Sequence, residues 1–169
     1  MADSLARLTR PRDPERIRLS RVPAETMTTL DADAIWFLEA AVYDGHLTLQ
    51  LAEALPSDTP DGWMVGDAVV ETHPLEVTEA SRCYDLRFEA PTAWQVVDEE
   101  VTGERAPGAP VVELLEDSSY LGFIRESCGW FSEEEGQVRH WRIWTLEEVV
   151  DVVSTAEPSL EAVERKPRN

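Results

Sequence analysis

The sequence predicts a single α+β domain that is rich in β-strand, with a mainly antiparallel sheet and few short helices. Two observations predict this class: apolar and polar residues alternate with period two in several short segments, and turn-forming residues separate those segments. The length of 169 residues suits one domain. We expect a basic N-terminal arm over residues 1–15, an acidic β-rich domain over 16–160 and a basic C-terminal tail over 161–169.

The first predicted element is a β-hairpin around Asp44 and Gly45. A two-residue turn there would place Val42 opposite Leu47 and align the apolar residues of both halves on one face. A helix over residues 33–43 competes with this prediction, because it would also gather apolar residues on one face. We favour the hairpin, since the second half alternates with period two and needs a partner strand.

The middle of the chain contains further strands between loops. Residues 56–76 mix Pro, Gly and Asp with short apolar pieces, which predicts a loop around a brief strand near residues 68–71. Residues 82–90 alternate and predict a strand with Tyr, Leu and Phe inward, and residues 92–101 predict a continuation or a second strand. Residues 102–110 hold two Gly and two Pro in nine positions, which predicts a loop.

The C-terminal third adds the last elements. Residues 118–127 are predicted as a strand, and residues 138–144 as a strand with bulky aromatic side chains on both faces. Residues 145–155 leave two alternatives open. Thr145 and Glu148 fit a capping box that would begin a helix, whereas the many valines after them favour a strand.

The chain is strongly acidic, with 34 Asp and Glu against 15 Lys and Arg and a formal net charge of −19. Residues 1–21 and 165–169 each sum to +3, so residues 22–164 hold six Arg and 31 acids, or 6 − 31 = −25. Such a field repels phosphate groups, which argues against direct nucleic-acid binding and against binding to anionic membranes. A basic protein partner is favoured instead.

The first residues contain no secretory signal, and no apolar run approaches the roughly 18 residues of a membrane span. We therefore expect a cytoplasmic protein. Cys83 and Cys128 are 128 − 83 = 45 positions apart and belong to no CxxC motif, so we expect neither a disulfide scaffold nor a zinc site. We assign no metal, no cofactor and no catalytic residue from the sequence.

The histidines are the only side chains that ordinarily titrate near neutral pH. His46 and His73 are predicted as exposed turn or strand-end residues. His140 lies in a strand between aromatic residues, and it is the one base around which scattered carboxylates could form a small hydrolase-like site. This enzyme is the alternative to a binding protein, and a structural subunit of a larger assembly is a third.

Aromatic and acidic residues gather in residues 126–144, where an apolar ring surrounded by charge would suit a protein interface. The alternative is that the indoles fill a small core. The residues that we predict to contact a partner are Trp130, Glu133, Glu134, Glu135, His140, Arg142 and Trp144.

The segment HWRIW followed by TLEEVVDVVST resembles the C-terminal strands of small uncharacterised bacterial β-rich domains, including acidic immunity proteins that neutralise toxins. The resemblance covers about the last thirty residues of the domain and rests on apolar spacing, and it transfers no site residue. It implies a single cytoplasmic domain that works by binding a basic partner such as a toxin, a nuclease or a complex subunit. Mimicry of nucleic-acid charge is a related possibility.

Overall fold

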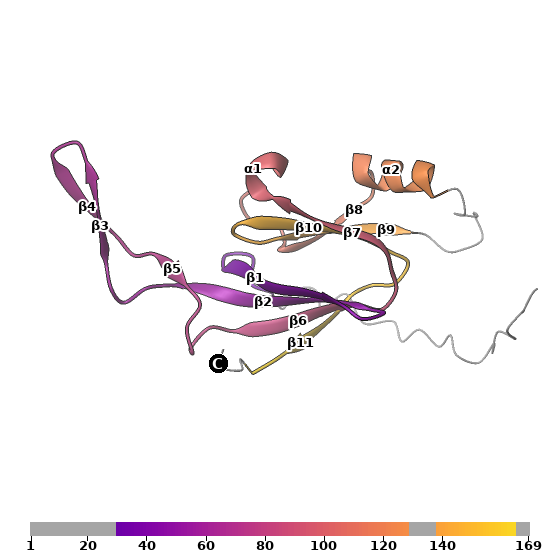
Figure 1. The fold of residues 1–169 in the computed structure, drawn as a ribbon, viewed down its shortest axis with the longest axis horizontal. Coiled ribbons are helices and arrows are strands. Elements are labelled where there is room, and N and C mark those ends of the chain that lie inside the picture. The colour runs from indigo at the N-terminus through magenta and orange to yellow at the C-terminus, as the bar shows by residue number, and fades with distance from the viewer. Residues whose placement is uncertain (1–29, 129–137, 165–169) are drawn as a thin grey trace, which may run out of the picture.

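The computed structural model describes residues 30–128 and 138–164. They form two antiparallel β-sheets that pack face to face, with two short helices beside the second sheet and a third, two-stranded sheet that projects from one end (Figure 1). The predicted β-rich, antiparallel domain is therefore confirmed, although its helical part is limited to one helix of nine residues and one of four.

The first sheet has the strand order β1-β2-β6-β11, and β5 also pairs with β2. Its strands are β1 Ile35–Tyr43, β2 Leu47–Pro56, β5 Leu75–Glu76, β6 Cys83–Phe88 and β11 Ser159–Ala162.

The second sheet has the strand order β7-β10-β9-β8. The helices follow β7 and β8, and the two-stranded sheet lies between β2 and β5 in the chain. These elements are β7 Pro91–Asp98, α1 Glu99–Thr102, β8 Val112–Leu115, α2 Ser119–Ser127, β9 Arg139–Trp144, β10 Glu148–Ser154, β3 Asp61–Val65 and β4 Ala68–Thr72.

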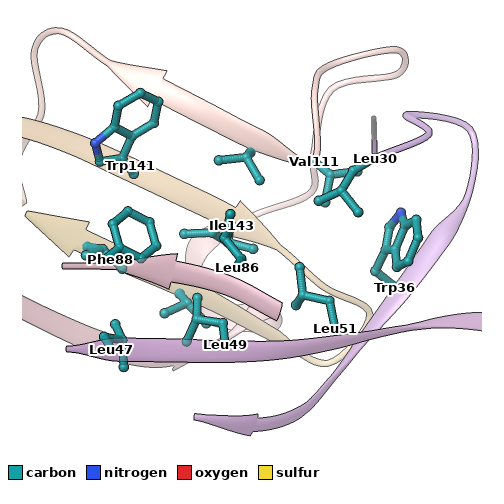
Figure 2. Packing of buried hydrophobic residues seen from close by; sticks show 13 residues of the cluster. Leu30, Trp36, Leu47, Leu49, Leu51, Leu86, Phe88, Val111, Trp141 and Ile143 are labelled. Carbon is teal, nitrogen blue, oxygen red and sulfur yellow. The ribbon is translucent and has the colours of Figure 1, made fainter. Parts of the chain in front are cut away.

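The core lies between the two large sheets (Figure 2). Alternate residues of β2 and β6, among them Leu49 and Phe88, face Trp141 and Ile143 of β9. These four side chains are at most 3% exposed. Because strand residues alternate between faces, the same alternation that buries one side of β9 directs His140, Arg142 and Trp144 to the outer side.

The hairpin of β1 and β2 confirms the first predicted element, but the predicted pairing of Val42 with Leu47 is wrong. Tyr43 pairs with Leu47, so the connection has three residues, and Gly45 at φ +99° takes a left-handed conformation. A bulge between Leu38 and Ala40 then restores the register toward the other end.

Residues 118–127 form α2 and not the predicted strand. The Ser118 side chain accepts a hydrogen bond from the backbone N–H of Leu121, which satisfies one of the free donors at the helix start. Leu121 and Ile124 are the buried residues of the helix, and they pack with Val153 of β10. Their spacing of three positions is a helical one.

In three other segments the structure adds to the prediction from sequence or decides between its alternatives. Residues 56–76 contain a complete hairpin, β3 and β4, where only the second strand was predicted. Strand β7 ends at Asp98, whose side chain accepts a hydrogen bond from the backbone N–H of Glu100 and begins α1. The open question at residues 145–155 is settled as strand β10, and Thr145 and Glu148 form the turn before it.

We predict that Leu49→Ala lowers the free energy of unfolding by about 2–5 kcal/mol, because the leucine is fully buried between the sheets. The matched control is Val42→Ala on the partner strand, where the side chain is 48% exposed and the loss should stay below about 1 kcal/mol. Urea denaturation measures both. Equal losses would contradict the described core.

Candidate functional site

Four polar side chains form a row across the outer face of the second sheet. The strand registers place Gln95 of β7 beside Asp151 of β10, Asp151 beside Arg142 of β9, and Arg142 beside Glu113 of β8. The row runs perpendicular to the strands, so each residue contacts its neighbour on the next strand. Asp151 is at the centre of the sheet and receives hydrogen bonds from both sides.

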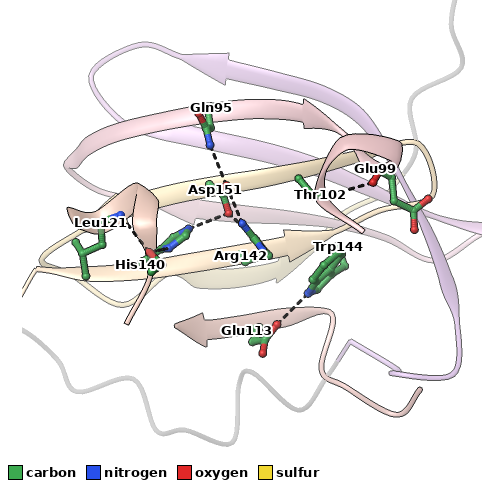
Figure 3. A network of polar contacts seen from close by, with 10 residues as sticks. Gln95, Glu99, Thr102, Glu113, Leu121, His140, Arg142, Trp144 and Asp151 are labelled. Atoms are coloured by element: carbon green, nitrogen blue, oxygen red, sulfur yellow. Dashed lines mark hydrogen bonds and ion pairs between the residues drawn. The ribbon is translucent and has the colours of Figure 1, made fainter. Parts of the chain in front are cut away.

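Asp151 is 1% exposed and accepts hydrogen bonds from three side chains (Figure 3). Arg142 donates from Nε to Oδ1 at 2.8 Å and from Nη2 to Oδ2 at 3.2 Å. The Gln95 side-chain amide donates to Oδ2 at 3.0 Å. His140 Nε2 lies 2.8 Å from Oδ1. Burial alone would raise the pKa of Asp151, but the hydrogen bonds from His140, Arg142 and Gln95 together hold that pKa well below its usual range.

His140 is fully buried and connects Asp151 to the start of α2. Its Nδ1 lies 2.6 Å from Ser118 Oγ. Because Ser118 Oγ accepts the backbone N–H of Leu121, its own hydrogen is free to point at Nδ1. With its hydrogen on Nε2, the imidazole donates to Asp151 Oδ1 and can accept from Ser118 at Nδ1. The result is a continuous chain of serine hydroxyl, imidazole and carboxylate.

Trp144 closes the other side of the row. Its Nε1 donates to Glu113 at 3.1 Å, and the Arg142 guanidinium carbon lies 5.4 Å from the centre of its ring. Trp144 is 9% exposed, so its indole is almost completely buried.

The structure therefore brings three of the predicted partner-contacting residues together: His140, Arg142 and Trp144 share one face and contact Asp151 or each other. Their contact with a partner stays a prediction. Trp130 and Glu133–Glu135 lie outside the described residues. Asp151, Gln95 and Ser118 were not predicted as site residues from the sequence, because only the strand registers and the helix start place them near His140.

A second candidate site is the projecting hairpin, which we define as residues 57–74. Every residue of β3 and β4 is exposed, although these strands contain a run of apolar side chains. The exposed fractions are 63% for Trp63, 67% for Met64, 64% for Val65, 64% for Val69 and 45% for Val70.

The projecting hairpin has a well-defined base and tip. Ser57 N donates to Pro74 O at 2.7 Å, which extends the pairing of β2 with β5. At the tip, Val65 pairs with Ala68, so Gly66 at φ +63° and Asp67 form a two-residue turn. A Gly-Asp pair between two apolar runs is typical of such a turn, and this was the sequence pattern from which the hairpin was predictable.

The surroundings of the projecting hairpin are acidic. Residues 57–81 contain no Lys or Arg, and they hold Asp58, Asp61, Asp67, Glu71, Glu76 and Glu79.

Other site types find little support in the part of the chain that the structure describes. There, no three His, Cys, Asp or Glu side chains gather as metal ligands would, and Cys83, which is buried, and Cys128, which is half-buried, form no disulfide. No helix among those residues has the length and apolar character needed to cross a membrane. Comparisons with protein-family models, curated proteins and solved structures find no significant match.

We predict that Asp151→Asn lowers the free energy of unfolding by about 3–5 kcal/mol at pH 7, because it leaves Arg142 without its carboxylate. Because the folded-state pKa of Asp151 is lowered, its stabilisation is complete above the ordinary pKa of about 4 and declines as the pH falls further. The difference in the free energy of unfolding between wild type and Asp151→Asn should therefore decrease below about pH 4.

Urea denaturation at a series of pH values from 7 to 3 measures this gap. Glu89→Gln is the matched control, since Glu89 pairs with Arg87 on the surface, and that change should cost less than about 1 kcal/mol. A gap between wild type and Asp151→Asn that is constant across the whole range would contradict the assigned role of the carboxylate.

Proposed function

We propose that this chain is a non-enzymatic acidic binding protein that engages a basic protein partner through charge complementarity and exposed aromatic and apolar side chains. The observation that supports this most is the projecting hairpin, which carries Trp63 at 63% exposure within an acidic segment. A large aromatic ring surrounded by apolar residues and charge is the usual composition of an interface centre.

The charge of the described residues supports the same function. Residues 30–128 and 138–164 hold six Arg and 27 acids, or 6 − 27 = −21. Four of these Arg already pair with carboxylates inside the protein: Arg82, Arg87, Arg139 and Arg142. The excess of carboxylates remains to steer a basic partner toward the surface and to raise the rate of association.

The proposed mechanism is occlusion. Carboxylates near the projecting hairpin pair with Lys or Arg of the partner, while Trp63 supplies apolar contact in the centre. This suits an immunity-type protein that covers the active surface of a toxin or nuclease, and it equally suits an accessory subunit. We place the protein in the cytoplasm in this proposal. The aromatic contact differs from the one expected from sequence, since Trp144 is buried.

A second candidate function is hydrolysis, which the chain of Ser118, His140 and Asp151 supports. In this candidate Ser118 Oγ attacks an acyl carbon, its proton passes to His140 Nδ1, and His140 returns that proton to the leaving group. Asp151 would stabilise the imidazolium. The nearby cavity of about 530 Å³ is lined by residues of β8, α2 and β9, and Ser118 is not among its lining residues.

The projecting hairpin and the charge can be tested together by affinity capture from the native cells. In the truncated variant, Asn-Gly replaces residues 58–73 between the paired residues Ser57 and Pro74. We expect wild type to retain a basic protein at 50 mM salt, to lose most of it at 500 mM, and the truncated variant to retain little at either. Retention of the same protein by both variants, without salt dependence, would contradict the proposal.

Two controls accompany the capture. The truncated variant should melt within a few degrees of wild type, because every residue of β3 and β4 is exposed. Tyr43→Ser removes an apolar side chain that is 57% exposed at the β1–β2 turn, and it should leave capture unchanged. A loss of capture in this control would indicate non-specific apolar binding.

The hydrolytic candidate is tested with a fluorophosphonate probe, which labels activated serines. If the protein is not an enzyme, the probe should label wild type no more strongly than it labels the variants Ser118→Ala and Ser119→Ala. These variants change adjacent serines at the start of α2. Labelling that disappears in Ser118→Ala and in His140→Gln, but persists in Ser119→Ala, would establish the hydrolytic candidate and contradict the binding-only proposal.

A further inference from the structure

We infer that the partner encloses the projecting hairpin on both of its faces, in a cleft with apolar walls and a basic rim. This inference rests on the proposed function and specifies the shape and chemistry of the partner that would satisfy it. It is carried by the way in which the strand register distributes the exposed apolar side chains of β3 and β4.

The register places two apolar pairs on opposite faces of the ribbon. Trp63 pairs with Val70 and Met64 pairs with Val69. Because neighbouring strand residues point to opposite faces, the first pair lies on one face and the second pair on the other. All four side chains are between 45% and 67% exposed, so neither face is covered by the rest of the protein.

A hairpin that binds a flat surface needs only one apolar face. Antiparallel strands with one solvated face alternate apolar and polar residues, so that the solvated face is polar. The projecting hairpin departs from this pattern, since Met64 and Val69 on one face are as exposed as Trp63 on the other. A flat partner would leave one of these pairs in water, whereas a cleft removes both pairs from water.

The position of the projecting hairpin permits such an enclosure. Figure 1 shows β3 and β4 extending beyond the end of the body, away from both large sheets. A two-stranded ribbon alone in water is at best marginally stable, so an enclosing partner would also stabilise its strand pairing.

The rim of the cleft is basic. Residues 57–81 hold six acids and no Lys or Arg, and Asp67 lies in the turn at the tip, where it would enter first. A second copy of this chain would bring the same acids and a body of the same negative charge, so like charges would oppose each other. Charge complementarity therefore selects a different, basic protein as the occupant.

The test is photo-crosslinking in the native cells. The crosslinking residue p-benzoylphenylalanine replaces Trp63 on one face, Met64 on the other, or Val42 at the far end of β1 and β2 as the matched control. We expect crosslinks from positions 63 and 64 to one and the same basic protein, and no crosslink to it from position 42. Loss of both crosslinks at 500 mM salt in extracts supports the basic rim.

The other outcomes show whether the enclosing cleft alone or also the proposed function is overturned. Crosslinks from only one of positions 63 and 64 would overturn the enclosing cleft but leave the proposed function intact, because a flat partner would then be bound. Crosslinks only to a second copy of the chain, or only within the chain, would overturn both. The absence of any crosslink from positions 63 and 64 would also overturn both.

A partner identified in this way allows a quantitative check. Trp63→Ser and Met64→Ser should each weaken binding by about tenfold or more, because each removes an apolar group from one wall of the cleft. Val42→Ser should change binding less than about twofold. Since these side chains are exposed in the free protein, the variants should keep the melting temperature of wild type. A tenfold loss with only one of the two face variants again indicates a flat partner.

Discussion

The apolar faces of β-strands are stabilised when they are buried away from water. Two parts of this molecule, the body formed by the two large sheets and the projecting hairpin, differ in whether this burial occurs. In the body, the two large sheets cover each other, and Leu49, Phe88, Trp141 and Ile143 are withdrawn from water between them. The projecting hairpin carries apolar residues of similar size but belongs to neither sheet. We therefore expect the two large sheets to be stable without these residues, and the proposed binding role would account for their exposure.

The polar row on the outer face of the second sheet shows how this protein stabilises a buried charge. Asp151 is buried in the middle of a strand, and it is tolerated because Arg142, Gln95 and His140 satisfy its oxygens. The same contacts attach α2 to the sheet through Ser118. Arg142 and three of the other five arginines among the described residues pair with carboxylates of their own chain, and the described residues keep a large excess of negative charge.

The two candidate sites differ in what they offer a ligand. The chain of Ser118, His140 and Asp151 has the connectivity of a nucleophile, base and acid, but its imidazole is fully buried and its carboxylate is shared with Arg142. The contacts of this chain stabilise the fold. The projecting hairpin has few contacts with the fold and a large exposed apolar surface, which is the opposite situation and the one expected of an interface.

The sequence predicted the fold correctly where a simple local pattern of residues decided the structure. Period-two alternation gave β6 and β9, including the faces of Trp141 and Trp144, because the alternation follows directly from strand geometry. It failed where a single local feature changed the outcome: the three-residue turn at Gly45, and the serine that begins α2. Propensity also misassigned the projecting hairpin, since its Pro, Gly and Asp residues indicate a loop when the pairing partner is unknown.

The site was predictable only in part for the same reason. His140, Arg142 and Trp144 were recognised because they alternate along one strand. Asp151 lies on the next strand along the chain, but the sequence left that segment open between helix and strand. Gln95 reaches Asp151 through pairing with a strand 56 positions away, a separation that no local pattern records. The exposure of Trp63 is likewise a property of the assembled fold, because it depends on what the two sheets leave uncovered.

The central claim is that none of the described residues outside the projecting hairpin covers it. Hydrogen–deuterium exchange of the isolated full-length chain tests this most directly, by comparing backbone amides of residues 61–72 with those of β9 and β10. The account predicts that the hairpin amides exchange orders of magnitude faster, because local opening of an uncovered two-stranded ribbon requires little free energy. Protection equal to that of β9 and β10 in a dilute monomer would show that the chain covers the hairpin itself and would contradict the account.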